Sequence, residues 1–492
     1  MNMTSIPRLF RFGKNGWTAP ARSIPCLLLG LLISSRGVAA PNGAVGDTNI
    51  RYFGRWDFSS STQSVSYWGG AYFKVKFTGT TATLKVGSNT QYYAQIDGGP
   101  WTTRVPTSGV INLTPTPLAG GTHSLTVAQG KDYSYVFNFQ GLVLDAGAVT
   151  LAPAVSPRLI EFIGDSITAG YTDAQANVSD YGWVCAEAMG FEHTQIAYPG
   201  IKLASGYTGV GMDQQYFKER SLAYATSADW DFTRYMPSIV VINLGQNDGS
   251  AVPDSVFQSD YVTFLGAIRG KFPDAQIYVM RAFLGTKQTP TQAAVNARIA
   301  AGDNKLHYVN TSGWLTSSDY NDGVHPSVAG HIKAANLLQP ILSGAPVPAY
   351  FETENLTVQS TTAGVTHRTL EDPGFSQGLG TILDSTAPGQ QVTYVLPGVA
   401  SGAYSVKIGV KNFGTRGIWQ LSASPAGNPA ASSNVGTPQD SYASAPDFRE
   451  LSLGTWTPGT TSDKWFKFTV TGKNGSSAGY TISFDSISLI PQ

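Results

Sequence analysis

A serine, an aspartate and a histidine stand in two short segments whose residue types could form a hydrolytic site. Ser166 comes shortly after an apolar run at 159–163, and Asp322 precedes His325 by three residues much later in the chain. A serine hydroxyl becomes an effective nucleophile when a neighbouring base takes its proton and a third group orients that base. These three side chains therefore predict serine-dependent acyl transfer, with Ser166 as nucleophile, His325 as base and Asp322 as its orienting acid.

Two further positions could stabilise the negative charge that develops on the substrate oxygen. Asn247 follows an apolar run at 239–244, and its side-chain amide could donate a hydrogen bond to an oxyanion. Gly200 follows Tyr198 and Pro199 and could present a backbone N–H. One such donor is worth roughly 10²–10³ in rate. A helix beginning near Ser166 would direct its own free N–H groups to the same oxygen.

The elements that must position these residues are predicted by hydrophobic patterning. Continuous apolar runs at 159–163, 239–244, 277–280 and 306–309 predict buried parallel strands. A helix is expected at 181–189, with Asp180 as N-cap and Gly190 as C-cap, and another at 327–338, opened by Pro326 just after His325. Strands that alternate with helices predict an α/β domain with a parallel sheet over 153–343. Sites in such sheets form at the carboxyl ends of strands.

Strand-like alternation of apolar and polar residues flanks this central block on both sides. Phe73, Val75 and Phe77 alternate with lysines, and similar runs recur between turn signals across 41–152, which predicts an N-terminal β-sandwich of the jelly-roll type. The same alternation returns across 350–492 and predicts a second β-sandwich. The proline-containing segment 344–349 is expected to be a linker.

The first forty residues predict a signal peptide and hence a secreted, extracellular protein. They carry five basic residues and no acid, then an apolar run at 26–33 and small residues before position 41. The rest of the chain has five fewer Lys and Arg than Asp and Glu, which favours neither nucleic acid nor an anionic membrane as a partner. Cys185 is the one cysteine outside the leader, so no intramolecular disulfide is expected.

The blocks around these residues resemble those of the SGNH (GDSL) hydrolases in order and spacing. The resemblance covers roughly 157–343 and implies a Ser166–His325–Asp322 triad that needs no cofactor for catalysis. It also implies an oxyanion hole formed by the backbone N–H groups of Ser166 and Gly200 and the amide of Asn247. The blocks are Gly164-Asp165-Ser166, Gly200, Gly245-Gln246-Asn247-Asp248 and Asp322-Gly323-Val324-His325. Because Thr168 replaces the second glycine of Gly-X-Ser-X-Gly, the α/β-hydrolase elbow is not expected.

The N-terminal region is similar to that of carbohydrate esterase family 2, whose members remove acetyl groups from xylan, glucomannan and related polysaccharides. Arg55, Trp68-Gly69-Gly70, Gly79-Thr80 and 120–123 carry this resemblance. It implies an acetylxylan esterase-like enzyme whose partner is an acetylated polysaccharide or oligosaccharide. Two alternatives stay open: an SGNH esterase for pectin-type acetyl or short-chain lipid and aryl esters, and a non-catalytic carbohydrate-binding protein. Residues expected to line the substrate cleft are Trp68, Trp314 and Tyr207.

The C-terminal region resembles carbohydrate-binding modules of families 6 and 35. In those modules, acids at both ends of the domain hold a structural calcium ion, which requires hard oxygen ligands. Carried over to this chain, the ligands would be Glu352, Glu354 and Asp485. Trp419, Trp456 and Trp465 are candidate platforms for stacking sugar rings.

Overall fold

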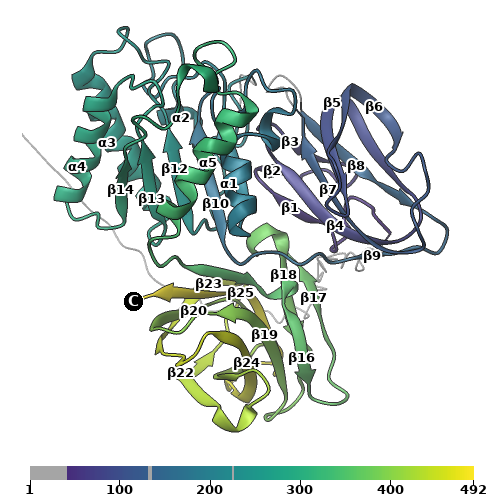
Figure 1. Cartoon of the computed structure of the whole chain (residues 1–492). Helices are drawn as coiled ribbons and strands as arrows, with labels where there is room; N and C mark the ends of the chain where they lie inside the picture. The colour runs from purple at the N-terminus through teal and green to yellow at the C-terminus, as the bar shows by residue number, and fades with distance from the viewer. Residues whose placement is uncertain (1–41, 131–135, 224–226) are drawn as a thin grey trace, which may run out of the picture. The chain divides into compact units, whose positions relative to one another are not determined.

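The computed structural model describes residues 42–130, 136–223 and 227–492 (Figure 1). The predicted signal peptide at 1–40 lies outside the described residues. Within them, a strand-rich N-terminal region, a central α/β region and a strand-rich C-terminal region follow one another along the chain, which confirms the predicted fold class. No helix in the described part is both long and apolar enough to cross a membrane.

The N-terminal region is a nine-stranded sheet in which one long strand joins two groups of strands. The first part of β5 pairs with β8 and its last part with β7, so β5 passes from one group to the other. Phe73, Val75 and Phe77 of β4 point into the core while the lysines between them do not, as the alternation predicts. The strands are β1 (Arg51–Phe53), β2 (Trp56–Asp57), β3 (Ser64–Ser66), β4 (Tyr72–Gly79), β5 (Ala82–Ile96), β6 (Thr102–Asn112), β7 (Gly121–Gln129), β8 (Phe137–Leu144) and β9 (Thr150–Leu151).

The central region is a five-stranded parallel sheet in the order β11-β10-β12-β13-β14. Its strands are β10 (Leu159–Gly164), β11 (Glu192–Ala197), β12 (Ile239–Asn243), β13 (Gln276–Met280) and β14 (Leu306–Val309). Its α-helices are α1 (Tyr181–Met189), α2 (Met212–Gln215), α3 (Asp254–Lys271), α4 (Gln288–Ala300) and α5 (Val328–Leu342), and the 3₁₀ turns are η1 (Ala176–Val178) and η2 (Ser317–Asp319). In this order the strand sequence reverses beside β10, the place where doubly wound folds put their sites.

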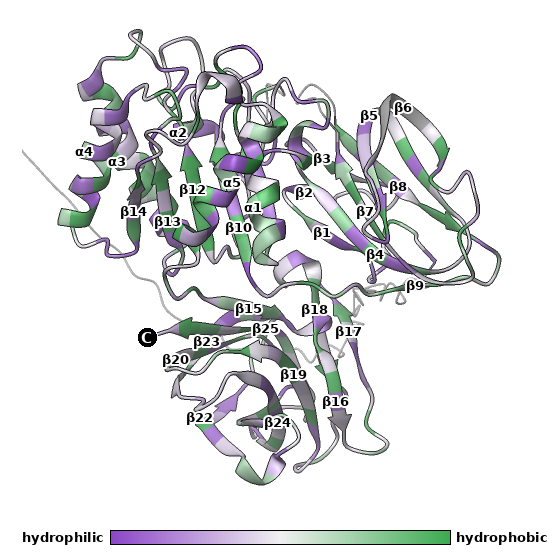
Figure 2. Ribbon diagram, in the orientation of Figure 1, coloured by the Kyte–Doolittle hydropathy of each residue, from purple (hydrophilic) through white to green (hydrophobic). Residues whose placement is uncertain are grey.

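Both faces of the middle strand β12 are buried, which explains why it is a continuous apolar run. Val240 and Ile242 of β12 pack into a core with α3 and α4, whereas Ile239 and Val241 pack into a second core with α1 and α5. Successive side chains of a strand point to opposite faces, so every residue of β12 meets a helix layer. Figure 2 shows β12 and β13 as largely hydrophobic.

Two helix predictions are confirmed closely. Asp180 caps α1 by accepting hydrogen bonds from the backbone N–H groups of Gly182 and Trp183, and Gly190 closes the helix in the left-handed conformation. The helix after His325 begins one residue later than expected, because Ser327 is its N-cap rather than its first residue.

The edge strand β11 was not predicted, because four of its six residues are polar and yet all six are buried. The N-terminal region contacts two of them: the Tyr72 hydroxyl donates to the Glu192 carboxylate and accepts the backbone N–H of His193, and Lys74 forms an ion pair with Glu192 at 2.8 Å. The aromatic rings of Tyr72 and Trp183 enclose His193. The charged Glu192 of this strand can therefore be buried, because Tyr72 and Lys74 of the N-terminal region pair with its carboxylate.

The C-terminal region consists of two antiparallel sheets, of six and five strands, around one apolar core. The first and last strands, β15 and β25, pair directly, with Phe351 opposite Ile487. The strands are β15 (Ala349–Glu352), β16 (Thr357–Thr361), β17 (His367–Glu371), β18 (Leu379–Leu383), β19 (Gln391–Val399), β20 (Tyr404–Asn412), β21 (Gly417–Pro425), β22 (Ser433–Asp440), β23 (Asp447–Trp456), β24 (Ser462–Lys473) and β25 (Ile482–Pro491). The 3₁₀ turns are η3 (Thr353–Asn355), η4 (Ser376–Gly378) and η5 (Pro429–Ala431).

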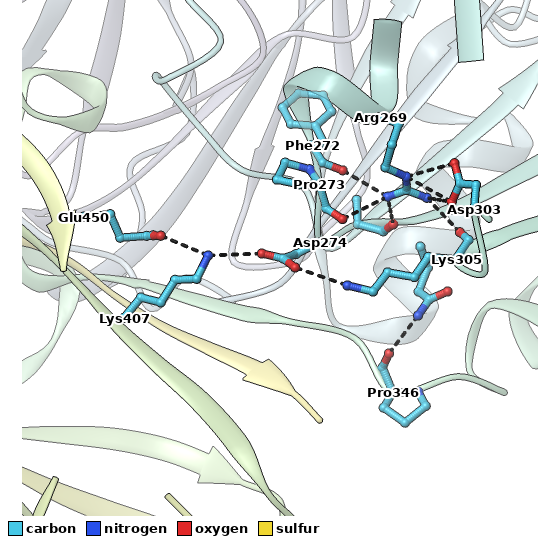
Figure 3. A network of polar contacts seen from close by, with 11 residues as sticks. Arg269, Phe272, Pro273, Asp274, Asp303, Lys305, Pro346, Lys407 and Glu450 are labelled. Carbon is cyan, nitrogen blue, oxygen red and sulfur yellow. Dashed lines mark hydrogen bonds and ion pairs between the residues drawn. The ribbon is translucent and has the colours of Figure 1, made fainter. Parts of the chain in front are cut away.

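The segment predicted as a linker, 344–349, is held against the central region. The carbonyl of Pro348 accepts a hydrogen bond from the Ser238 hydroxyl at 2.7 Å, and that of Pro346 accepts one from Gln276 at 3.3 Å. Figure 3 shows Asp274 between two lysines, Lys305 at 3.1 Å and Lys407 of β20 at 3.3 Å. Specific polar contacts therefore join segment 344–349 and the C-terminal region to the central region.

Candidate active site

The nucleophile candidate lies where β10 ends, at the edge of the sheet expected from the topology. Ser166 is 6% exposed and is followed by a hydrogen-bonded turn rather than by a helix. No helix begins at Ser166, so helix N–H groups do not lie directly behind it, and the first helical residues after it are at 176–178. Gly164 allows this tight turn, because a Cβ there would lie 2.0 Å from the Thr168 hydroxyl and 3.0 Å from the Asn243 carbonyl.

The acid and the base share one short turn before α5. His325 Nε2 lies 2.9 Å from Ser166 Oγ, and His325 Nδ1 lies 2.7 Å from Asp322 Oδ2. The other carboxylate oxygen of Asp322 accepts the backbone N–H groups of Val324 and His325, at 3.0 and 2.8 Å. Gly323, at φ +84°, provides the left-handed residue that this turn requires. The structure therefore joins all three predicted residues in one hydrogen-bonded chain.

The charge on Asp322 is maintained by these hydrogen bonds. The backbone N–H of His325, followed by its imidazole, lowers the pKa of the Asp322 carboxyl to about 2. Asp322 is therefore ionised throughout the range in which a histidine exchanges its proton. An ionised acceptor at Nδ1 keeps the proton on that nitrogen and leaves Nε2 free to take the proton of Ser166.

Asn321, which the sequence patterns did not single out, links the turn that carries Asp322 and His325 to the loop that follows Ser166. Asn321 Nδ2 donates to Thr172 Oγ1 at 2.9 Å and to Asp173 Oδ1 at 3.0 Å. Thr172 has φ +79°, a left-handed conformation that is uncommon for a β-branched residue. A residue in such an unfavourable backbone conformation is kept there only where surrounding contacts hold it. Asn321 therefore links the segment that carries His325 to the segment that carries Ser166.

The expected oxyanion donors lie in the turns that follow β11 and β12. The amide of Asn247 donates to the Ile201 carbonyl at 3.0 Å and to Asp165 Oδ2 at 3.3 Å. Both amide hydrogens thus have protein acceptors, and donation to an oxyanion would replace the longer bond, to Asp165. Gly200 is exposed in a turn anchored by the backbone N–H of Tyr198 on the Gly164 carbonyl, at 3.2 Å. The oxyanion role of these groups stays a prediction.

The carboxyl next to the nucleophile is fully buried. Burial raises the pKa of Asp165 to about 7, and the nearby Asp248 carboxylate adds to the increase, although the backbone N–H of Ile167 opposes it. The group is therefore neutral in the folded protein over much of the acidic range in which it would be charged in an unfolded chain.

Replacing Asp165 with asparagine is expected to change how stability depends on pH. Because folding raises this pKa, the carboxyl stabilises the folded state fully at pH values below 3.8, its pKa in the unfolded chain. This contribution disappears as the pH rises through about 7, the pKa in the folded protein. An amide stays neutral, so the unfolding free energy of Asp165→Asn relative to wild type should increase over this range by up to about 4 kcal/mol. Urea titrations at a series of pH values measure this difference. The exposed Asp463→Asn serves as control, and parallel pH profiles for wild type and Asp165→Asn would contradict the expectation.

The three residues expected to line the cleft differ in burial. Trp68 is 1% exposed, packs in the core beside Arg55, and donates its indole N–H to the Glu219 carbonyl at 3.0 Å. It cannot contact a substrate, so that prediction is wrong. Trp314 packs against Phe283 in the core that contains α1 and α5, whereas Tyr207 packs against the core that contains α3 and α4. Both side chains are half-buried, and their substrate roles stay predictions.

The three acids proposed as calcium ligands are close in the fold. Glu352 and Asp485 both accept the hydroxyl of Ser376, at 2.6 and 2.7 Å, and burial raises the pKa of Glu352, Glu354 and Asp485. Nevertheless, among the described residues no three His, Cys, Asp or Glu side chains are grouped so that they could hold a metal ion. The predicted calcium site is therefore not supported.

The tryptophans proposed as sugar platforms differ in burial. Trp419 is fully buried in the C-terminal core, where its indole N–H donates to Ser441, so it cannot be a platform. Trp456 is half-buried and packs edge-on against Phe466. Trp465 is also half-buried.

One aromatic residue at the site was missed by sequence reasoning. Tyr171 is 40% exposed, and its ring centroid lies 4.9 Å from that of the His325 imidazole. A lone tyrosine in a turn carries no pattern that distinguishes it from a surface residue. Its position five residues after Ser166 was the available signal.

Comparisons with known proteins agree with this geometry. Residues 162–332 match the GDSL-like Lipase/Acylhydrolase family, and residues 52–153 match the Carbohydrate esterase 2 N-terminal family. The "Cellulase/esterase CelE" of Acetivibrio thermocellus is 31% identical over 57% of this chain, although the match spans only 38% of that relative's length. An "Acetylxylan esterase / glucomannan deacetylase" of Cellvibrio japonicus is 28% identical over 63% of this chain and 95% of that protein.

A solved structure shows the same arrangement of the first two regions. A family two carbohydrate esterase from Clostridium thermocellum, in complex with cellohexaose, is 28% identical, with a TM-score of 0.55 over 60% of this chain and 98% of that one. The chain therefore contains a carbohydrate esterase 2 N-terminal domain followed by a GDSL-like hydrolase domain, and in this combination it resembles the carbohydrate esterases of family 2.

Proposed function

We propose that this protein is a secreted carbohydrate acetylesterase that removes O-acetyl groups from plant polysaccharides of the xylan or glucomannan type. The observation that carries the proposal is the hydrogen-bonded chain from Ser166 Oγ through the His325 imidazole to the Asp322 carboxylate. These three hydrogen-bonded side chains provide a nucleophile, a base and an orienting charge, which are the groups that serine-dependent acyl transfer requires.

The chemistry proceeds in two steps through a serine acyl-enzyme. Ser166 Oγ attacks the acetyl carbonyl carbon while His325 Nε2 takes the hydroxyl proton, and the same imidazole then protonates the departing sugar oxygen. Water, deprotonated by His325, attacks the acetyl-enzyme and releases acetate. Backbone N–H groups of Ser166 and Gly200 and the Asn247 amide are the proposed donors to the oxyanion in both steps. None of these steps uses a cofactor.

The substrate class is proposed from the relatives. The name of the Cellvibrio japonicus relative describes acetylxylan esterase and glucomannan deacetylase activity, and one solved relative was determined in complex with cellohexaose. The predicted leader at 1–40 supports secretion, which would bring the enzyme to extracellular polysaccharide. Carbohydrate binding by the C-terminal region belongs to the same proposal, with the half-buried Trp465 as its candidate platform.

Acetate release across a panel of acetylated substrates tests the proposal. We expect turnover of acetylated xylan and glucomannan oligosaccharides at higher kcat/KM than acetylated pectin or chitin oligomers. Aryl esters of increasing acyl length provide the second arm, in which acetyl should be preferred. A preference for acyl chains beyond about four carbons, or for pectin, would favour the alternative SGNH esterases, because kcat/KM ratios report differences in transition-state binding.

A further inference from the structure

The aromatic ring of Tyr171 packs beside the His325 imidazole and is partly exposed to solvent. Tyr171 presents 40% of its surface to solvent, and its ring packs at 60° to the imidazole plane of His325. Nε2 of the same imidazole lies 2.9 Å from Ser166 Oγ. Tyr171 therefore contacts the ring that carries the proton-transferring nitrogen.

The backbone of Tyr171 is fixed with respect to the nucleophile. Its N–H donates to the Ser166 carbonyl at 3.0 Å, and the preceding N–H, of Gly170, donates to Ile167 at 3.3 Å. The following residue, Thr172, is held by Asn321. A ring on such a short, anchored turn loses little conformational freedom when it binds a ligand, and pre-organisation of this kind favours affinity.

The direction of proton transfer determines where the sugar must lie. When the ester breaks, the departing sugar oxygen has to come within hydrogen-bond distance of His325 Nε2 to receive its proton. The carbon that carries this oxygen belongs to the sugar ring, or is attached to it, so the sugar lies beside the imidazole. Tyr171 contacts the same imidazole, and its exposed ring offers an apolar face to the C–H groups of a pyranose.

We propose that Tyr171 is a substrate-contacting residue that packs against the sugar ring bearing the ester. The inference rests on the proposed acetylesterase function and adds a specificity element to it. The ring contributes to recognition of the leaving sugar and not to recognition of the acetyl group. It therefore favours hydrolysis of carbohydrate esters over small alkyl esters that have the same acyl group.

Two substrates with the same acyl group and different leaving groups test this inference. Acetylated xylo-oligosaccharide has a sugar leaving group, whereas ethyl acetate has no ring to pack. Tyr171→Ala should raise KM for the oligosaccharide about tenfold, the size expected for one ring contact, and leave kcat/KM for ethyl acetate unchanged. Tyr171→Phe keeps the ring and should retain wild-type values on both substrates. Phe58→Ala is the matched control, because Phe58 is also 40% exposed but belongs to the N-terminal region, and it should change neither value.

Each other outcome has a definite meaning. Equal losses on both substrates for Tyr171→Ala would show that the ring acts through His325, and wild-type values on both would show that it has no role; either result overturns the inference alone. A wild-type protein that hydrolyses ethyl acetate but no acetylated oligosaccharide would overturn the proposed function and the inference with it.

Discussion

Ser166→Ala is expected to lose at least roughly 10⁴-fold in kcat on acetyl esters, because no other group can form the acyl-enzyme. Removal of the nucleophile leaves the oxyanion donors and the binding surface, so a small rate above the uncatalysed reaction should persist. The substitution removes one hydroxyl from a position that is 6% exposed, and the fold should tolerate it. Steady-state hydrolysis of an aryl acetate measures the loss, and labelling by a serine-directed organophosphonate should disappear with it.

The control for this variant is a serine of equal burial outside the triad. Ser179 is also 6% exposed, and its hydroxyl donates to the Ala176 carbonyl at 3.0 Å. Ser179→Ala should keep its turnover and its labelling. If Ser166→Ala kept more than about one percent of wild-type turnover with a normal melting curve, another nucleophile would have to be sought.

His325→Ala should reduce kcat by a similar factor, because the imidazole serves as base in one step and as acid in the next. The two residues act as a unit, so the double variant Ser166→Ala/His325→Ala should be no slower than either single variant. The buried His331 provides the control: it lies six residues later on α5, its Nδ1 accepts the backbone N–H of Tyr181, and its Nε2 lies 3.7 Å from Asp173 Oδ2.

Two results would contradict this expectation for His325. Multiplying losses in the double variant would mean that the residues act independently. Unchanged labelling of Ser166 by the organophosphonate in His325→Ala would mean that the hydroxyl is activated by another group. His331→Gln should label like wild type if it remains folded, and thermal unfolding shows whether it does.

The elements that position the triad were predictable from sequence because their signals are local. β10, β12 and β13 are almost entirely buried, so they stand out as mainly apolar runs, and the shorter, partly buried β14 still begins and ends with a buried apolar residue. The caps of α1 work through side-chain and backbone atoms within three residues of the helix end. The spacing of Asp322 and His325 likewise favours a short turn in which the carboxylate and the imidazole hydrogen-bond directly.

What sequence could not predict depends on contacts between distant segments. β11 is polar because Tyr72 and Lys74 of another domain cover it, and no local pattern shows that. Trp68 was assigned to the cleft, although Arg55 and the Glu219 carbonyl hold it in the core. Tyr171 is placed at the site by the turn after Ser166, whose geometry follows from tertiary contacts.

The most direct test of the central claim compares acetate release from acetylated xylan by wild type and Ser166→Ala at equal protein concentration. The claim predicts rapid release by wild type and, from the variant, release no faster than about one ten-thousandth of that rate. Release by the variant at a rate close to wild type, or none by a folded wild-type protein, would contradict it.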